Sequence, residues 1–318
     1  MLASMIALGL LGLGMPSDGP DDLRGHQDVP VPIVGGTEVP LGRWDAVGAF
    51  QIGVRFCSGT MVAPRLMLTA AHCLTGLSPS QAESILVVFG PSAYTPAAVT
   101  RAADFGVFER YCEECTRDRF DLGYVLLREA VSLPGGFPPL VTDQETWDAV
   151  MVDGKPMVAV GYGQSRDGEP SLADDKGVGI KREVGVSYRG FSESGLDFRA
   201  GGDGRGTCAG DSGGPAFVEL EDGRWALAGV LSGGFGACGD GGLFMVPLLA
   251  LPWIRDQTGV DLLPRGCADA DCVDTTLPED GCGCRSKPGT LPGPALACLL
   301  AVVVLRVRRR GAHSTQLQ

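Results

Sequence analysis

The chain has 318 residues and a formal net charge of −12, from 26 Lys and Arg against 38 Asp and Glu. Nucleic-acid binding calls for a basic face on the protein. The acidic balance argues against such a face, so no nucleic-acid partner is expected. Apolar residues make up 44%, which is enough for a substantial core, and 48 Gly with 22 Pro favour turns over long helices. The length fits one large domain or two small ones.

The first segments predict export. Residues 1–15 (MLASMIALGLLGLGM) form an apolar run suited to the core of a signal peptide, although no basic residue precedes it. Residues 16–32 are rich in Pro, Asp and Gly and are interpreted as a propeptide or linker.

Residues 33–259 carry short apolar runs between turn signals, which predicts an all-β domain of barrels. One helix is expected in LLALPWIRDQTGV, near the end of this domain. The runs that favour strands are AFQIGV, RLMLTAA, SILVVFG, LGYVLL, MVAVGYG, EVGVSY, WALAGVLSGG and GLFMVP.

Eleven cysteines favour an oxidising compartment, and the odd number leaves at least one outside a pair within the chain. Cys112 and Cys115 form a CxxC, a spacing that also occurs in redox motifs and half metal sites. The domain offers no second half-site, so a local disulfide is the preferred interpretation.

The C-terminal segments predict surface tethering. Residues 260–290 are interpreted as a Cys-, Pro- and Asp-rich stalk, and residues 291–307 as a transmembrane or sorting segment of marginal length. The basic residues that follow predict a cytoplasmic tail over 308–318.

The stretch GDSGG at 210–214 raises the possibility of a nucleophilic serine, Ser212. A serine needs a base within hydrogen-bond reach and a group that orients the base. Of three histidines, His26 lies in the predicted propeptide and His313 in the predicted tail, so only His72 is available to the domain.

Asp121 precedes an apolar strand pattern and completes the order His72, Asp121, Ser212. This order is that of the chymotrypsin-type triad, whereas an α/β-hydrolase needs the order Ser, acid, His. His72 could alternatively be a core residue or a zinc ligand, but no second histidine supports a metal site.

The chain resembles the trypsin/chymotrypsin-like serine proteases over residues 33–259. IVGG (33–36), TAAHC (69–73), DLGYVLL (121–127) and GDSGGP (210–215) match the motifs of that family, and GYG, LSGG and PWIRDQTG resemble later landmarks. The resemblance implies two antiparallel six-stranded Greek-key barrels with a short C-terminal helix.

The resemblance also implies roles. Ser212 would be the nucleophile, His72 the general base and acid, and Asp121 the residue that orients His72. The N–H groups of Gly210 and Ser212 would form the oxyanion hole. The implied disulfides are Cys57–Cys73 and Cys208–Cys238.

By the same resemblance the chain is made as a zymogen. Cleavage before Ile33 would create an amino group that pairs with buried Asp211. Pro32 stands where the family usually has Arg or Lys, so a different activating protease is expected as a partner.

The resemblance assigns the primary specificity pocket to Gly206, Ser232, Gly234 and Gly242. An uncharged, open pocket favours a large apolar side chain. If the alignment with the family is shifted, Asp240 would reach the base of the pocket and restore a preference for basic side chains. Gly233 stands where the family usually has a tryptophan, which forms a wall for the neighbouring substrate residue.

The tail, GCGCRS followed by an apolar segment and arginines, resembles the C-terminal sorting signals of myxobacterial surface proteins. Cys282 or Cys284 would then be the processed or anchoring cysteine. The alternative is an uncleaved single membrane span.

The function expected from the sequence is therefore an exported, surface-tethered serine endopeptidase that acts on proteins or peptides without a cofactor or metal. The alternative is a catalytically silent binding module on the same fold, which Pro32 and the missing pocket wall would permit.

Overall fold

The computed structural model describes residues 32–53, 55–115, 119–166, 177–192, 195–267 and 273. The predicted signal peptide, the propeptide up to residue 31, the membrane or sorting segment, the tail, Cys282 and Cys284 lie outside these residues. Within them, no helix is both long enough and apolar enough to cross a membrane.

The first half of the domain is a closed antiparallel barrel. It contains the runs AFQIGV, RLMLTAA, SILVVFG and LGYVLL as strands, together with two strands that carry more polar residues. In spatial order the strands are β2 (Val47–Ile52), β3 (Arg55–Ala63), β4 (Leu66–Thr69), β7 (Gly123–Leu127), β6 (Ala98–Val107) and β5 (Leu86–Phe89), and β5 closes the barrel by pairing with β2.

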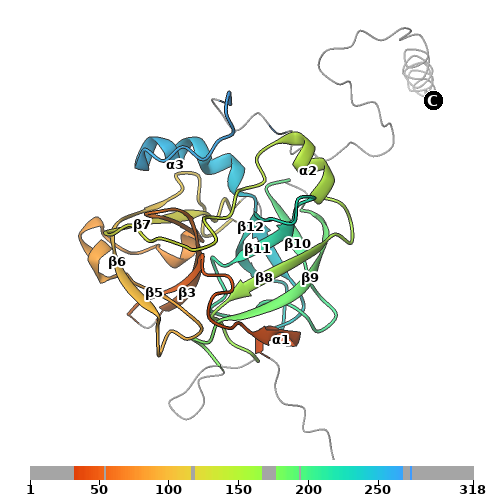
Figure 1. Ribbon diagram of the computed structural model, residues 1–318, viewed down its shortest axis with the longest axis horizontal. Coiled ribbons are helices and arrows are strands. Elements are labelled where there is room, and N and C mark those ends of the chain that lie inside the picture. Colours follow the sequence, from red (N-terminus) through yellow and green to blue (C-terminus); the bar gives the residue numbers. More distant parts are fainter. Residues whose placement is uncertain are drawn as a thin grey trace, which may run out of the picture. The chain divides into compact units, whose positions relative to one another are not determined.

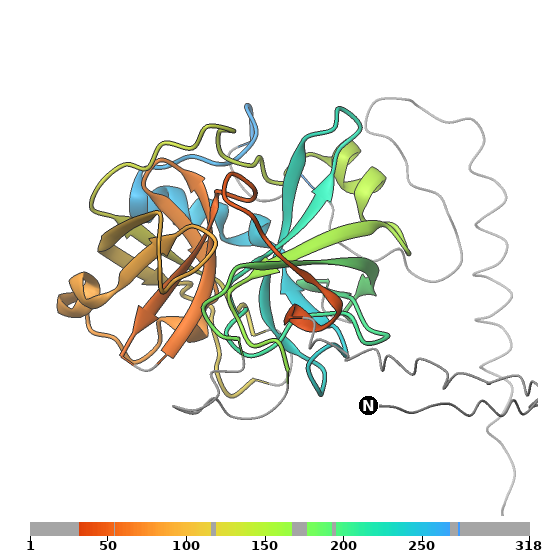
Figure 2. The same ribbon diagram turned by 60° about the horizontal axis from the view of Figure 1, so that its bottom comes forward.

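The second half is a six-stranded antiparallel barrel with one extra strand at its edge. The barrel strands are β8 (Pro156–Gly161), β9 (Arg182–Phe191), β10 (Asp197–Ala200), β13 (Gly242–Met245), β12 (Trp225–Gly234) and β11 (Pro215–Glu219), and β1 (Thr37–Glu38) pairs with β9. Pairing of β8 with both β9 and β11 closes this barrel. Figures 1 and 2 show the two barrels side by side, the first in orange to yellow and the second in green to teal.

Short helices connect and cover the barrels. The turn α1 (Pro32–Gly35) contains non-helical backbone at Ile33 and Val34, and α2 (Gln144–Val150) begins where the Asp143 side chain accepts a hydrogen bond from Thr146 N. The 3₁₀ helices are η1 (Ala71–Cys73), η2 (Pro79–Ser84) and η3 (Pro247–Ala250).

The C-terminal helix α3 (Leu251–Thr258) tolerates Pro252 because proline in a first turn removes no intrahelical hydrogen bond. It ends at Gly259, whose φ of 74° favours glycine. Trp253 of α3 packs against Phe108 and Tyr124 of the first half of the domain, with ring centroids 5.3 Å apart in each pair. The predicted all-β fold of two barrels with a short C-terminal helix is therefore confirmed.

Candidate active site

His72 lies in η1, directly after β4, and is fixed to Asp121 through two contacts. Its backbone N–H donates to Asp121 Oδ1 at 2.8 Å, and its Nδ1 lies 2.7 Å from Asp121 Oδ2. A proton on Nδ1 directed at the carboxylate leaves Nε2 as the acceptor nitrogen. The imidazole is therefore oriented as a base, with 29% of its side chain exposed.

Asp121 is held in a tight turn just before β7. Leu122 N donates to Phe120 O at 2.7 Å across this residue, and Phe120 has a φ of 48°, which is unusual for a non-glycine residue. A third donor, Ser232 Oγ, reaches Asp121 Oδ2 at 2.6 Å. The side chain of Asp121 has no solvent exposure.

Opposing effects act on the pKa of Asp121. Burial favours the neutral acid, but the hydrogen bond and charge of His72, the Ser232 hydroxyl and the His72 amide together outweigh burial. The pKa of Asp121 is therefore lowered from its ordinary value, and the carboxylate stays ionised beside His72.

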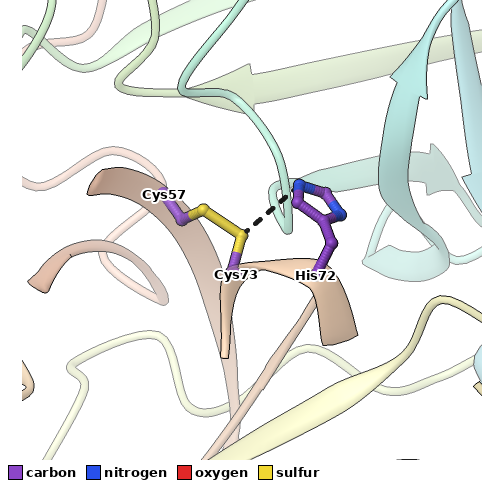
Figure 3. Close-up of side chains that lie close together, drawn as sticks. All are labelled: Cys57, His72 and Cys73. Carbon is purple, nitrogen blue, oxygen red and sulfur yellow. Dashed lines mark hydrogen bonds between the residues drawn. A yellow bond between two sulfur atoms is a disulfide. The ribbon is translucent and has the colours of Figure 1, made fainter. Parts of the chain in front are cut away.

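The disulfide between Cys57 and Cys73 lies beside the imidazole, as Figure 3 shows. Cys73 Sγ is 3.7 Å from His72 Nε2 and 3.8 Å from the main-chain oxygen of Ser212, so the two residues flank the same sulfur atom. Cys57, His72 and Cys73 form a cluster of the residue types that bind metals. Because its two sulfurs are bonded to each other, this cluster offers no thiolate ligand.

Ser212 lies in the turn that leads into β11. Its main-chain oxygen accepts from Ser58 N at 2.8 Å, and the next residue, Gly213, donates to Leu231 O of β12 at 2.8 Å. Gly213 has a φ of 82°, and a Cβ there would lie 2.0 Å from Thr69 Oγ1. The glycine after the serine is thus needed for both its backbone conformation and its small size.

Three backbone N–H groups around Ser212 have no acceptor among the described residues, those of Ala209, Gly210 and Ser212. Gly210 adopts a φ of 93°, a conformation that glycine permits. Ser58 helps to fix this conformation, since its hydroxyl donates to Gly210 O at 3.1 Å and accepts from Tyr162 N at 3.0 Å. The motifs gave no role to Ser58; only its place directly after Cys57 could have drawn attention to it.

Ser212 and His72 are brought to the same site, but Ser212 Oγ makes no hydrogen bond to His72 Nε2 in the part of the chain that the structure describes. Such catalytic hydrogen bonds often form only when substrate is bound. The geometry therefore supplies an oriented base and a turn that holds the serine beside it.

Asp211 is buried and accepts two backbone hydrogen bonds, from Gly163 N at 2.7 Å and from Cys208 N at 2.9 Å. Burial raises the pKa of Asp211 to about 7, although these two hydrogen bonds and the charge of Arg182 favour ionisation. Ile33 is also fully buried. Its nitrogen is a peptide amide in the intact chain, so the expected ion pair with Asp211 requires cleavage first.

A cavity of about 410 Å³ opens beside Ser212. No carboxylate or cationic side chain of the described residues lines it. The lining residues are Gln164, Thr207, Cys208, Ala209, Ser212, Leu231, Gly233, Gly234, Gly236, Ala237 and Cys238.

Of the four residues expected to form the pocket, only Gly234 lines this cavity. Gly206 packs against Gly241, with 3.1 Å between its ideal Cβ position and Gly241 N. Ser232 instead directs its hydroxyl to Asp121. Gly242 lies next to Leu231 and Thr207, which leaves no free space at its Cα.

Three disulfides join described residues: Cys57–Cys73, Cys112–Cys115 and Cys208–Cys238. The two pairs implied by the resemblance are therefore present, and the CxxC forms the local disulfide that was preferred over a redox or metal role. Cys208–Cys238 links the loop before Ser212 to the β12–β13 connection and lines the cavity.

Comparison with known proteins gives one family. Residues 33–254 match the trypsin family. Similar proteins include coagulation factor XII of Sus scrofa, 27% identical over 71% of this chain and 39% of that protein. Another is serine protease filzig of Drosophila melanogaster, 27% identical over 64% of this chain and 13% of that protein. The chain thus spans less than half the length of these relatives. Because the family match covers more than two thirds of the chain and the site combines His72, Asp121 and Ser212 in the order this family uses, the chain belongs to the trypsin family of serine proteases.

Proposed function

We propose that this protein is an exported serine endopeptidase that hydrolyses peptide bonds through an acyl-enzyme. The observation that carries the proposal is the doubly hydrogen-bonded pair of His72 and Asp121 facing the turn of Ser212. The membership of the trypsin family and the N–H groups of Gly210 and Ser212, which have no acceptor among the described residues, support it.

In the proposed reaction, Ser212 Oγ attacks the carbonyl carbon of the scissile bond and passes its proton to His72 Nε2. The N–H groups of Gly210 and Ser212 stabilise the oxyanion that forms, an interaction worth roughly 3–4 kcal/mol for each donor. His72 then protonates the leaving amine as the C–N bond breaks. His72 next takes a proton from a water molecule, which attacks the carbonyl carbon of the acyl ester. When the ester C–O bond breaks, His72 returns the proton to Ser212 Oγ.

An extended peptide has a place to bind beside this site. β12 pairs with β11 only up to Val230, and with β13 from Val230 to Gly234. The stretch 232–234 therefore has an open edge on the β11 side within the described residues, and a substrate would add there as a strand.

The uncharged cavity next to Ser212 favours a large apolar residue before the scissile bond. Asp240, the residue that could have made the pocket basic-selective, is exposed, and its carboxylate accepts from Ala237 N at 2.9 Å within its own loop. Peptides with Phe at this position should be cleaved faster than matched peptides with Arg; the reverse ranking would contradict the apolar assignment.

We further propose that the chain is an inactive precursor until an activating protease cuts after Pro32 and frees the amino group of Ile33. The complete burial of both Ile33 and Asp211 supports this pairing, because a buried carboxylate needs a countercharge. Surface tethering through residues 291–307 or through Cys282 or Cys284 is part of the same proposal and rests on the sequence alone.

The test is to treat the processed extracellular protein with a serine-reactive phosphonate probe, with Ser212→Ala as the control. N-terminal sequencing of the labelled band would accompany it. Labelling of the wild type alone, with Ile33 as the first residue, is the expected result.

Absence of labelling despite an Ile33 terminus would overturn the proposal in favour of the non-catalytic binding module. Absence of labelling with an intact Pro32–Ile33 bond would identify an unprocessed precursor. Cleavage by a protease added in vitro should then restore labelling.

A further inference from the structure

An open space lies over the second barrel next to the cavity. Gly233 of β12 and Arg199 of β10 both pair with Leu243 of β13, so the three residues form a row across neighbouring strands. Directly paired residues project from the same face of a sheet. No atom of the described residues lies within 4 Å of the position that a Cβ at Gly233 would occupy, and Leu243 is partly exposed.

An aromatic side chain borders this space. Phe235 is 46% exposed, and it stands between Gly234 and Gly236, both of which line the cavity beside Ser212. The guanidinium carbon of Arg199 lies 4.8 Å from the centroid of the Phe235 ring. A positive charge is therefore held at the rim of the cavity by contact with an aromatic face.

Arg199, like Arg110 and Arg205, has no carboxylate partner in the described part of the chain. Other arginines do have one: Arg43 pairs with Glu183, Arg189 with Asp203 and Arg224 with Asp222. The hydrogen-bond donors of Arg199 thus remain available to a ligand, and guanidinium groups bind carboxylates with matched geometry.

We propose that Arg199, Phe235 and Leu243 form a second substrate subsite that selects an acidic side chain two to three residues before the scissile bond. This inference rests on the proposed function. With one substrate side chain in the cavity, the preceding residues would run along the open edge at 232–234. At about 3.3 Å for each residue of an extended strand, the side chain of the second or third residue before the scissile bond reaches the Phe235 rim.

The features of the subsite have separate roles. Leu243 and the Phe235 ring contact the methylene groups of the substrate side chain, and Arg199 binds its carboxylate. The space left by Gly233 admits that side chain; a large residue at position 233 would fill it.

The experiment uses the processed full-length protein and peptides with Phe before the scissile bond. Glu, Gln or Lys is placed in turn at the second, third and fourth residue before that bond. We expect kcat/KM for Glu to exceed that for Gln by about 2- to 5-fold at one of the first two of these positions, as for other exposed charge pairs. Lys should be disfavoured, and added salt should reduce the difference.

Arg199→Gln should remove the Glu preference, so that the Glu and Gln peptides are cleaved at similar rates, and Arg199→Lys should retain part of the preference. Arg224→Gln, which removes the same charge from the β11–β12 hairpin, should behave as wild type. The inference is overturned if wild type shows no preference for Glu, or if the preference survives in Arg199→Gln.

Binding of the same peptides to Ser212→Ala, measured by fluorescence anisotropy, separates the subsite from catalysis. Tighter binding of the Glu peptide that depends on Arg199 would support the subsite even if the wild-type chain took up no serine probe. Equal binding of the Glu and Gln peptides would overturn the subsite even if the wild type were labelled.

Discussion

At the scale of single residues, the conformation of Gly210 depends on a hydroxyl outside the recognised motifs. The side chain of Ser58 is buried and connects Gly210 O to Tyr162 N. With its carbonyl fixed in this way, Gly210 can direct its N–H toward the place where an oxyanion would form. Ser58 is therefore a positioning residue for the proposed oxyanion hole.

Ser58→Ala should lower kcat more than it changes KM, since the donor it positions acts mainly in the transition state. It should also lower the free energy of unfolding by about 1–3 kcal/mol, because the buried amide of Tyr162 and the half-buried carbonyl of Gly210 lose a partner. Steady-state kinetics and urea unfolding would measure both effects, with Ser80→Ala, an exposed serine, as the control. An unchanged kcat would rule out the positioning role.

Gly213 and Gly223 provide a matched test of space against backbone conformation. Their φ angles are 82° and 79°, but a Cβ at Gly213 would meet Thr69 and Ser58, whereas nothing lies within 4 Å at Gly223. Gly223→Ala should cost only the strain of a positive φ, about 1–2 kcal/mol. Gly213→Ala should cost several kcal/mol more or prevent folding, as thermal unfolding would show; equal losses would mean that the turn around Ser212 can expand.

Three short motifs and the scarcity of histidine single out His72, Asp121 and Ser212 in the sequence, and the structure places His72 and Asp121 in hydrogen-bond contact. The role of Ser232 could not be predicted from the sequence. Its hydroxyl points to Asp121 rather than to the pocket, and this direction depends on how β12 of one barrel meets the β7 end of the other. Such contacts between distant segments leave no local pattern in the sequence.

At the scale of elements, two of the disulfides close loops that hold the site. Cys57–Cys73 spans 16 residues and Cys208–Cys238 spans 30, whereas Cys112–Cys115 spans only 3. The loss of chain entropy in the unfolded state grows with loop length, so each of the two longer cross-links should stabilise the fold by roughly 3–4 kcal/mol.

Replacing Cys208 and Cys238 together with alanine should therefore lower the melting temperature and the activity together, because the same bond lines the cavity. Replacing Cys112 and Cys115 should have a much smaller effect on both. Calorimetry and peptide hydrolysis would test this ranking. If replacing Cys112 and Cys115 caused the larger loss, the loop that they close would contribute more to stability and activity than its short length suggests.

The elements themselves were predictable to different degrees. The core strands β4 and β5 are mostly buried and apolar, so their sequences resemble strands. β6 is mostly exposed or half-buried over Ala98–Val107, and β10 has only four residues, Asp197–Ala200. These strands are defined by backbone pairing with neighbours, which apolar periodicity does not reveal.

At the scale of the whole molecule, the buried Asp211 couples folding of the precursor to pH. Burial raises its pKa in the folded chain from the ordinary value of an aspartate to about 7. The folded state therefore holds this proton more tightly than the unfolded state. The stability it contributes is complete below about pH 4 and is lost as the pH rises through about 7.

Accordingly, the melting temperature of the uncleaved Ser212→Ala protein should fall between pH 5 and pH 8, and adding Asp211→Asn should reduce that fall. Asp222→Asn, an exposed site paired with Arg224, should leave the slope unchanged. Cleavage that frees the amino group of Ile33 should also reduce the slope, because the carboxylate then gains a countercharge. Differential scanning calorimetry at each pH would decide; an identical slope with Asp211→Asn would exclude Asp211 as its origin.

The three residues of the proposed triad are divided between the two barrels, and this has a consequence for engineering. His72 and Asp121 belong to the chain before the exposed Gly135 and Gly136, and Ser212 belongs to the chain after them. Neither piece made by cutting there would hold the full set of reacting groups. Two fragments fused to a pair of interacting proteins would then hydrolyse a dye-labelled peptide only upon reassembly, so that turnover would report the encounter of the fused partners.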